Sequence, residues 1–192
     1  MPLLADPALA AGCLAAEEQP TLDAGDGIIL RPWLLVDAPA VQEAFDDPEI
    51  QRWHVRRAES VEEARGWIES WRETWQRETD IHWAIADERK GTVLGRMSLK
   101  TLNLYDGLAV AAYWVAPWSR GVGVCTRALG AAADWAFGVG FHRLQLSHST
   151  ANTASCRVAE KTGFAAEGLR RASGKHADGW HDMHVHARFR EA

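Results

Sequence analysis

A chain of 192 residues is long enough for one domain with a sizeable core. Hydrophobic residues make up 47% and charged residues 24%, as in ordinary globular proteins. The formal net charge of -5 excludes a broad basic surface of the kind that binds nucleic acid or acidic membranes. We therefore expect neither a nucleic-acid partner nor a membrane partner.

The cysteines and the N-terminal segment indicate in which cellular compartment the protein works. Cys13, Cys125 and Cys156 form no Cys-x-x-Cys pair, and an odd number provides no disulfide framework. This pattern disfavours cysteine metal sites and fits a reducing, cytoplasmic setting. Residues 1–26 lack a basic start and make a poor signal peptide, so we expect a loosely ordered extension before a single domain over residues 27–192. No apolar run approaches the roughly 20 residues that span a bilayer.

The first part of the domain predicts a strand and two helices. A strand over residues 27–33 is followed by a helix that Asp37 caps and that ends before Pro48. Ser60 caps a second helix. Its apolar residues recur at helical spacing, which indicates core packing: Ala64, Trp67, Ile68, Trp71 and Trp75.

The remaining chain predicts strands and helices that complete a mixed sheet. The expected strands are residues 82–86, 92–99, 108–115, 142–147, 164–170 and 180–189, and the expected helices are residues 121–137 and 152–161. Residues 108–115 are apolar nearly throughout, which predicts burial on both faces and a central place in the sheet. The order β-α-α-β-β-β-α-β-α-β-β is that of a mixed α/β (α+β) domain.

The stretch from Pro117 to Val124 carries the clearest chemical signal. A buried strand ends there, a glycine-containing loop follows, and a helix is expected to begin at Gly121. Free amides in the first helical turn form an anion site, glycines let phosphate oxygens approach, and Arg120 adds a charged donor. The loop lacks the Gly-Lys-Ser/Thr of a P-loop and the third glycine of a dinucleotide site. These residues alone leave an ordinary strand-to-helix turn as the alternative.

Two ordered motifs resemble the GNAT acetyltransferase superfamily. Residues 120–125 resemble its pyrophosphate signature Arg/Gln-x-x-Gly-x-Gly/Ala, with Cys125 in place of the last small residue. Residues 152–164 are similar to the Asn-x-x-Ser-x-x-Val-x-x-Lys-x-Gly-Phe motif of the RimJ/RimL-like branch, which includes N-acetyltransferases for protein N-termini and small amines. The resemblance covers residues 28–189. It implies the GNAT fold, a mixed sheet of six to seven strands that splays between the fourth and fifth and is flanked by about four helices.

The resemblance also implies acetyl-CoA, or a close acyl-CoA relative, as acyl donor, and no metal. The splayed strand would pair with the pantetheine arm, and the Val115 amide would polarise the carbonyl. Asn152 would bond the arm, and Ser155, one helical turn later, would protonate the leaving thiolate. A serine that only bonds the helix backbone is the alternative for Ser155. The residues assigned to the cofactor are Trp114, Val115, Arg120, Gly121, Val122, Gly123, Val124, Cys125, Thr126, Asn152 and Ser155.

The resemblance does not identify the residue that acts as general base. Related enzymes often carry a glutamate on the strand before Tyr113, but Val110 stands there and cannot take a proton. His148 lies just past a strand end, and an ordinary histidine pKa of about 6.5 suits base catalysis, so we expect His148 to substitute. A histidine that only hydrogen-bonds the loop is the alternative. Asp106 is a further candidate for the base, but a role in the Asp106-Gly107 turn also explains why an aspartate stands there.

Other polar residues receive less specific interpretations. Trp53, His54 and Tyr113 are expected to contact the substrate. Asp182, His184 and His186 alternate and share one strand face, for which we favour a polar surface over a metal site.

The leading interpretation is a cytoplasmic N-acyltransferase that transfers an acetyl group from acetyl-CoA directly to a primary amine in a ternary complex. The acceptor would be a protein or peptide N-terminus or a small-molecule amine. A non-catalytic acyl-CoA-binding or regulatory protein stays open because of Val110, and so does a transferase of another acyl group such as succinyl. The resemblance also makes a homodimer possible.

Overall fold

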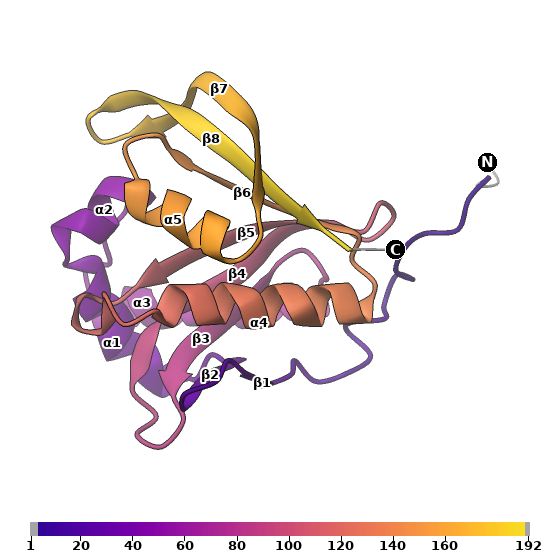
Figure 1. Cartoon of the computed structure of the whole chain (residues 1–192). Coiled ribbons are helices and arrows are strands. Elements are labelled where there is room, and N and C mark those ends of the chain that lie inside the picture. Colours follow the sequence, from indigo (N-terminus) through magenta and orange to yellow (C-terminus); the bar gives the residue numbers. More distant parts are fainter. Residues whose placement is uncertain (1–3, 191–192) are drawn as a thin grey trace.

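A single eight-stranded sheet runs through the part of the chain that the computed structural model describes, residues 4–190 (Figure 1). The strands are β1 (Leu22–Asp23), β2 (Ile28–Pro32), β3 (Ile81–Asp87), β4 (Val93–Asn103), β5 (Leu108–Val115), β6 (Arg143–Ser149), β7 (Ala165–His176) and β8 (Gly179–Phe189). Their order in the sheet is β1-β2-β3-β4-β5-β6-β8-β7. β5 and β6 pair in parallel, and the other neighbours pair antiparallel.

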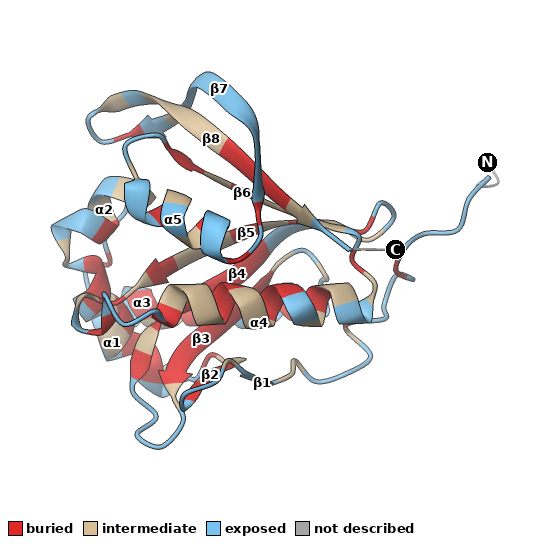
Figure 2. Cartoon of the chain, in the orientation of Figure 1, coloured by how far each residue is buried: buried red, intermediate tan, exposed pale blue. Residues whose placement is uncertain are grey.

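Helices cover both faces of this sheet. They are η1 (Leu35–Asp37), α1 (Ala38–Phe45), α2 (Pro48–His54), α3 (Val61–Gln76), η2 (Pro117–Ser119), α4 (Val124–Val139) and α5 (Thr153–Lys161). The α4 face holds the larger core, and α1 and α3 pack over a second core on the opposite face (Figures 1 and 2). β3 is therefore buried on both sides, since Trp83 joins the first core and Ala84 the second. None of the helices within residues 4–190 has the length and apolarity needed to cross a membrane.

The predicted fold class is confirmed, although the sheet has eight strands instead of the expected six to seven. Besides the 3-10 helices η1 and η2, two short elements were not predicted. One is β1, which has two residues. The other is α2: Pro48, expected only to end α1, also occupies its first turn, where proline's fixed φ suits a helix and its missing N–H costs nothing. The Asp47 side chain caps α2 by accepting from the Ile50 amide at 2.9 Å.

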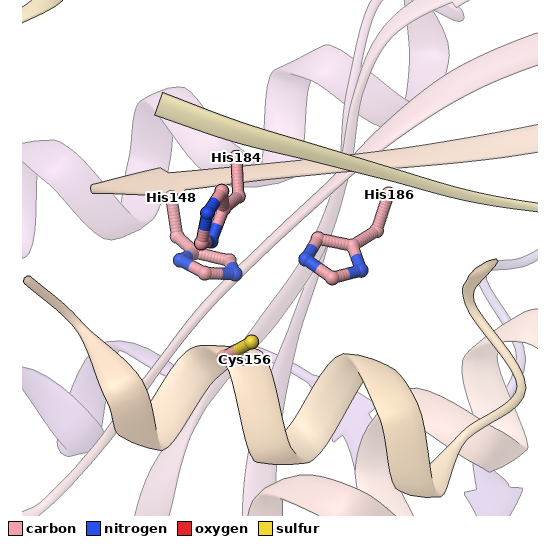
Figure 3. A group of neighbouring side chains, drawn as sticks. All are labelled: His148, Cys156, His184 and His186. Atoms are coloured by element: carbon pink, nitrogen blue, oxygen red, sulfur yellow. The ribbon is translucent and has the colours of Figure 1, made fainter. Parts of the chain in front are cut away.

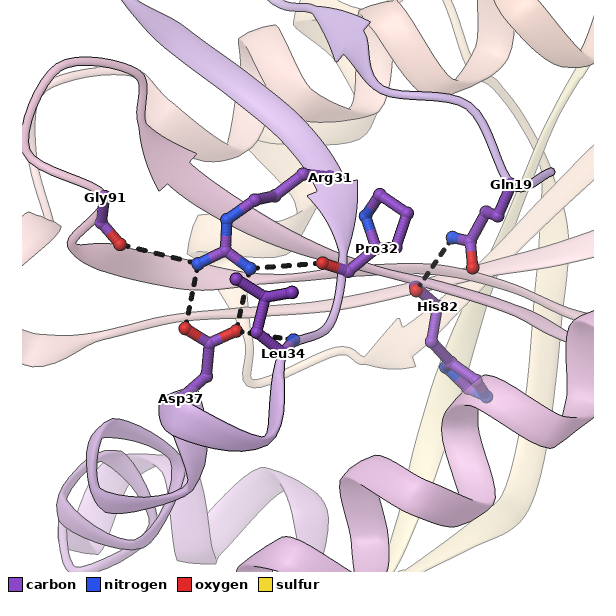
Figure 4. A network of polar contacts seen from close by, with 7 residues as sticks. All are labelled: Gln19, Arg31, Pro32, Leu34, Asp37, His82 and Gly91. Carbon is purple, nitrogen blue, oxygen red and sulfur yellow. Dashed lines mark hydrogen bonds and ion pairs between the residues drawn. The ribbon is translucent and has the colours of Figure 1, made fainter.

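Asp37 has a different role from the predicted helix cap. Its carboxylate makes no cap hydrogen bond to α1. It instead accepts two hydrogen bonds from the Arg31 guanidinium, at 2.7 and 2.8 Å, and one from the Leu34 amide at 2.9 Å (Figure 4). The carboxylate is buried, and this bidentate pair fixes the end of β2 to the end of η1.

Two other elements, α4 and β7, differ from their predicted boundaries. The helix expected from Gly121 begins at Val124, because Gly121 and Gly123 have φ of 82° and 81°, in the left-handed region. The strand expected over residues 164–170 continues to His176, with register shifts against β8.

The sheet opens between β5 and β6, as the fold expectation requires. Their pairing covers only the Leu108–Ala111 part of β5, while β4 continues to pair with β5 as far as Val115. β5 is thus central, but the continuous burial predicted for it is wrong, since several of its residues are half-buried. Gly95 permits the close approach of β4 here, because a Cβ on it would lie 2.4 Å from the Trp114 carbonyl oxygen.

The N-terminal segment contacts the domain at several points. The amides of Gly12, Leu14 and Ala15 donate to the Glu78 carboxylate at 2.6, 2.7 and 3.1 Å. The Gln19 side chain donates to the His82 carbonyl at 3.0 Å (Figure 4). The segment expected to be loosely ordered is also held by two indole N–H groups: Trp75 donates to the Glu17 carbonyl and Trp83 to the Pro20 carbonyl, each at 2.9 Å.

Replacing Glu78 with glutamine is expected to lower the free energy of unfolding by about 1–3 kcal/mol at neutral pH, because a charged acceptor of three amides is lost. Burial tends to raise the pKa of Glu78, but the three amides outweigh it and lower the pKa overall. The stabilisation is therefore present above the unfolded pKa of about 4.3 and is lost as the pH falls through the folded pKa.

Urea denaturation of both proteins at several pH values measures this difference. Glu73→Gln is the matched control, since Glu73 is exposed and pairs on its own helix with Arg77, at 3.4 Å. An equal effect of both substitutions, or a difference that persists at low pH, would contradict the anchoring role.

Candidate active site

A cavity of about 420 Å³ lies where β5 and β6 separate. It is lined by Glu49, Ile50, Trp53, His54, Tyr113, Trp114, Val115, Ser119, Arg120, Gly121, Gly123, Val124, Cys125, Thr126, Asn152, Ala154, Ser155, Arg157, Val158 and Lys161. Residues from α2, β5, α4 and α5 thus meet around one space. It brings together all the predicted cofactor and substrate residues except Val122.

The glycine loop forms one end of the cavity. After the left-handed Gly123, the first three amides of α4 belong to Val124, Cys125 and Thr126, which have no partner earlier in the helix. The first amide to bond back is that of Arg127, to the Gly123 carbonyl at 3.1 Å. This end of the cavity therefore offers amide donors and a helix dipole to an anion.

Val122 does not line the cavity, although the sequence assigned it to the cofactor. Its side chain is 64% exposed. Its carbonyl accepts a hydrogen bond of 2.7 Å from the Arg127 guanidinium, which curls back over the loop. Arg127 is thus a loop-fixing residue that the motif did not reveal.

Arg120 connects the loop to α2. Its guanidinium donates to Asp47 at 2.6 Å and to Glu49 at 3.2 Å. The hydrogen bond from Arg120 is the main cause of a lowered pKa at Asp47. Arg120 was expected to face phosphate, but in this arrangement it also holds α2 against the glycine loop.

The opposite wall is the first part of α5. The Asn152 side-chain oxygen accepts from the Ser155 amide at 3.0 Å and so caps the helix. Ser155 is 9% exposed, one turn along. Two cations on the same helix, Arg157 and Lys161, also line the cavity. Sequence reasoning missed them, although their i,i+4 spacing places both on one helix face.

The edge of β5 faces the opening. The Ala116 amide donates toward β4, to the Leu94 carbonyl at 2.9 Å. Successive amides of a strand point to opposite edges, so the Val115 amide points into the space that β6 vacates. The Trp114 ring packs instead in the second core, against Phe45, with ring centroids 5.6 Å apart.

The side of the cavity next to α2 joins Trp53, His54 and Tyr113. Burial, with Arg96 next, lowers the pKa of His54 to about 3, so its imidazole is neutral at physiological pH. Burial also raises the pKa of the Tyr113 phenol. Trp53 packs edge-on against His176, with ring centroids 5.6 Å apart.

The residues considered for general base lie outside the cavity lining. The His148 ring lies on the face of the sheet that α5 covers, 5.2 Å from the His186 ring centroid. Its Nδ1 is 2.9 Å from the Ser149 carbonyl oxygen. Asp106 bonds the Asn103 side chain within its own turn.

The fold and the cavity together define a class. This class consists of α/β proteins that have a cleft at a splayed sheet, with the free amides of a glycine-led helix N-terminus at one end of the cleft.

Comparison with known proteins assigns the family. Residues 28–165 match the acetyltransferase (GNAT) domain, and the chain belongs to this family. The uncharacterised N-acetyltransferase YoaA of Bacillus subtilis (strain 168) is 26% identical over 148 residues, 76% of this chain and 84% of YoaA. RimJ of Mycobacterium smegmatis, solved in complex with CoA-disulfide, is 25% identical with a TM-score of 0.77, covering 88% of this chain and 86% of RimJ.

A solved RimL, described as a ribosomal L7/L12 alpha-N-protein acetyltransferase in complex with coenzyme A, has a similar fold. Its TM-score is 0.79 at 20% identity, with 88% of this chain and 98% of RimL covered. The predicted GNAT family is confirmed, and these neighbours support the RimJ/RimL-like branch. The protein is a GNAT-type acetyltransferase.

Proposed function

We propose that this protein transfers an acetyl group from acetyl-CoA to a primary amine by direct attack in a ternary complex. The observation that carries the proposal is the cleft at the splay, where amide donors of α4, the open edge of β5 and the Ser155 wall surround one space. The acceptor is a protein or peptide N-terminus or a small-molecule amine. RimL acts on a ribosomal protein N-terminus, which makes peptide N-termini the first acceptors to test.

The residues of the donor side suit acetyl-CoA, which supplies an activated acyl thioester when it is bound. The amides of Val124, Cys125 and Thr126 would hold its pyrophosphate, with Arg157 and Lys161 near enough to add positive charge. The Val115 amide would donate to the acyl oxygen, which stabilises developing negative charge there. Ser155 would give a proton to the departing sulfur and regain one from the amine nitrogen as the amide forms, so that the serine ends neutral.

No strong base faces the acceptor amine in the cavity lining. Glu49 is its one carboxylate and already pairs with Arg120. His54 has a pKa of about 3 and holds a proton poorly. We therefore propose that the amine loses its proton to solvent before attack, and that His54 and Tyr113 serve as hydrogen-bonding groups.

The rate constant kcat/KM is expected to rise with pH along the pKa of the acceptor itself. This pKa is about 8 for an α-amino group and about 10.4 for a lysine-like amine. Measuring the profile with one acceptor of each kind tests the idea. A rising limb near pH 6.5 that is the same for both acceptors would indicate an enzymatic base instead.

One observation favours a second candidate, a non-catalytic acyl-CoA-binding protein. Val110, at the position of the family's glutamate, lies in β5 outside the cavity lining. A protein that binds the donor but lacks a base would show this cleft without turnover.

Thiol release from acetyl-CoA, measured over a panel of peptide N-termini and small primary amines, separates the two functions. The proposal expects release that depends on both donor and acceptor, with the acetylated acceptor visible by mass spectrometry. Binding of acetyl-CoA without release on any acceptor would support the second candidate. Competition between acetyl-CoA and succinyl-CoA in the same assay decides the acyl group.

Two less specific predictions, about the cellular compartment and the oligomeric state, accompany this function. Cys13, Cys125 and Cys156 are free, in keeping with a reducing compartment such as the cytoplasm. A homodimer stays a prediction, which light scattering of the full chain would test.

A further inference from the structure

Three histidines and a cysteine converge between the sheet and α5. His148 on β6 and His184 on β8 are direct cross-strand partners, and His186 lies two residues along on the same face. Cys156 on α5 points toward them from the opposite side (Figure 3). One ligand atom from each residue lies within 4.8 Å of all the others.

The imidazoles are oriented by backbone carbonyls. The His148 Nδ1 lies 2.9 Å from the Ser149 carbonyl oxygen, and the His186 Nδ1 lies 3.4 Å from the Phe164 carbonyl oxygen. A carbonyl only accepts, so each Nδ1 carries the proton and donates it. Each Nε2 is then left with a lone pair, which is the form of histidine that ligates metals.

Those lone pairs have no partner among the described residues. The Nε2 atoms of His148 and His186 are buried without a hydrogen bond, and so is the Nδ1 of His184. His148 is 6% exposed and His186 2% exposed, so these rings are more than nine-tenths buried. Burying a nitrogen without a hydrogen-bond partner costs free energy, so three such nitrogens in one place indicate that they share a ligand.

We propose that His148, His184, His186 and Cys156 bind one divalent transition-metal ion, with zinc as the best fit. Three imidazole nitrogens and one thiolate complete a tetrahedral set, for which zinc has the appropriate softness and geometry. The sequence favoured a plain polar face for His184 and His186. Only the folded chain adds His148 from β6 and Cys156 from α5.

Binding replaces the thiol proton of Cys156 with the metal bond, so one proton is released for each ion bound. The site then has a net charge of +1, from a divalent ion, one thiolate and three neutral imidazoles. Glu160 lies 3.7 Å from the Cys156 sulfur and supplies a nearby negative charge.

A set of four protein ligands leaves no open position for water or substrate, so the ion has a structural role. It joins α5 to β6 and β8. Cys156 directly follows Ser155, so the ion would hold the wall of the cleft in place. This role goes beyond acyl transfer and does not depend on it.

Calorimetric titration of the metal-free full chain with Zn²⁺ tests the proposal. We expect one ion per chain with a dissociation constant below about 1 µM, and a melting temperature that rises by roughly 5–10 °C. Cys156→Ser should weaken binding at least about 100-fold, because it removes a direct ligand. Co²⁺ should give a sulfur-to-cobalt charge-transfer band that Cys156→Ser abolishes.

Matched controls keep the test decisive. Cys13→Ser and His142→Gln change the same residue types at exposed positions and should leave zinc binding unchanged. His186→Gln is a second cluster variant, and circular dichroism of each metal-free protein confirms that it folds. Binding weaker than about 1 µM, no thiolate band, or equal affinity in the cluster variants and the wild type would overturn the proposal.

Discussion

Gly123→Ala is expected to weaken acetyl-CoA binding about tenfold, or about 1.4 kcal/mol. Gly123 has φ of 81°, and an L-residue held there costs about 1–2 kcal/mol. A Cβ would also lie 3.1 Å from the Arg127 guanidinium, which holds the Val122 carbonyl. The loop must then relax, and the first amides of α4 lose their alignment. Calorimetric titration with acetyl-CoA measures the loss.

Gly130→Ala is the matched control for that substitution. Gly130 lies in the same helix, outside the cavity lining, and nothing lies within 4 Å of a Cβ added to it. Alanine there should leave the dissociation constant unchanged and stabilise α4 by up to about 1 kcal/mol. Equal donor affinity in both variants would show that the loop does not hold the pyrophosphate.

Ser155→Ala is expected to lower kcat about 100-fold while KM for acetyl-CoA changes less than about twofold. A positioned general acid contributes about 100-fold or more to the rate, and the donor contacts assigned to α4 and β5 are untouched. The Ser155 hydroxyl is buried at the cavity, whereas its amide is already used by the Asn152 cap. Steady-state kinetics with saturating acceptor separate the two parameters.

Thr153→Ala provides the comparison within the same helical turn. Thr153 is exposed at the start of α5 and does not line the cavity. It should retain the wild-type kcat. If Ser155→Ala behaves like Thr153→Ala, the serine has only a structural role at the helix N-terminus.

The donor side of the site was predictable from sequence because its chemistry is local. A strand end, two glycines and the first turn of α4 follow one another along the chain, and Asn152 and Ser155 lie three residues apart. The two motifs therefore identified the lining that comes from the glycine loop and α4. On α5 they identified Ser155 and its cap Asn152, but not the other lining residues, which are Ala154, Arg157, Val158 and Lys161. Val122 lies outside the lining, exposed between the left-handed Gly121 and Gly123, and the motif does not encode this loop conformation.

The acceptor side was harder to predict because its residues meet only in the fold. Asp47 and Glu49 bind Arg120 across more than 70 residues of chain. The helix that carries Glu49 was itself missed, because its proline was interpreted as a stop rather than a start. The surroundings of His148 depend on strand pairing between β6 and β8, which the separate segments do not specify.

A crystal structure with acetyl-CoA tests the central claim most directly. We expect the pyrophosphate on the amides of Val124 to Thr126, the pantetheine arm along the open edge of β5, and the thioester beside the Val115 amide and Ser155. A donor bound elsewhere on the chain, or a pyrophosphate that does not touch the N-terminus of α4, would contradict the account.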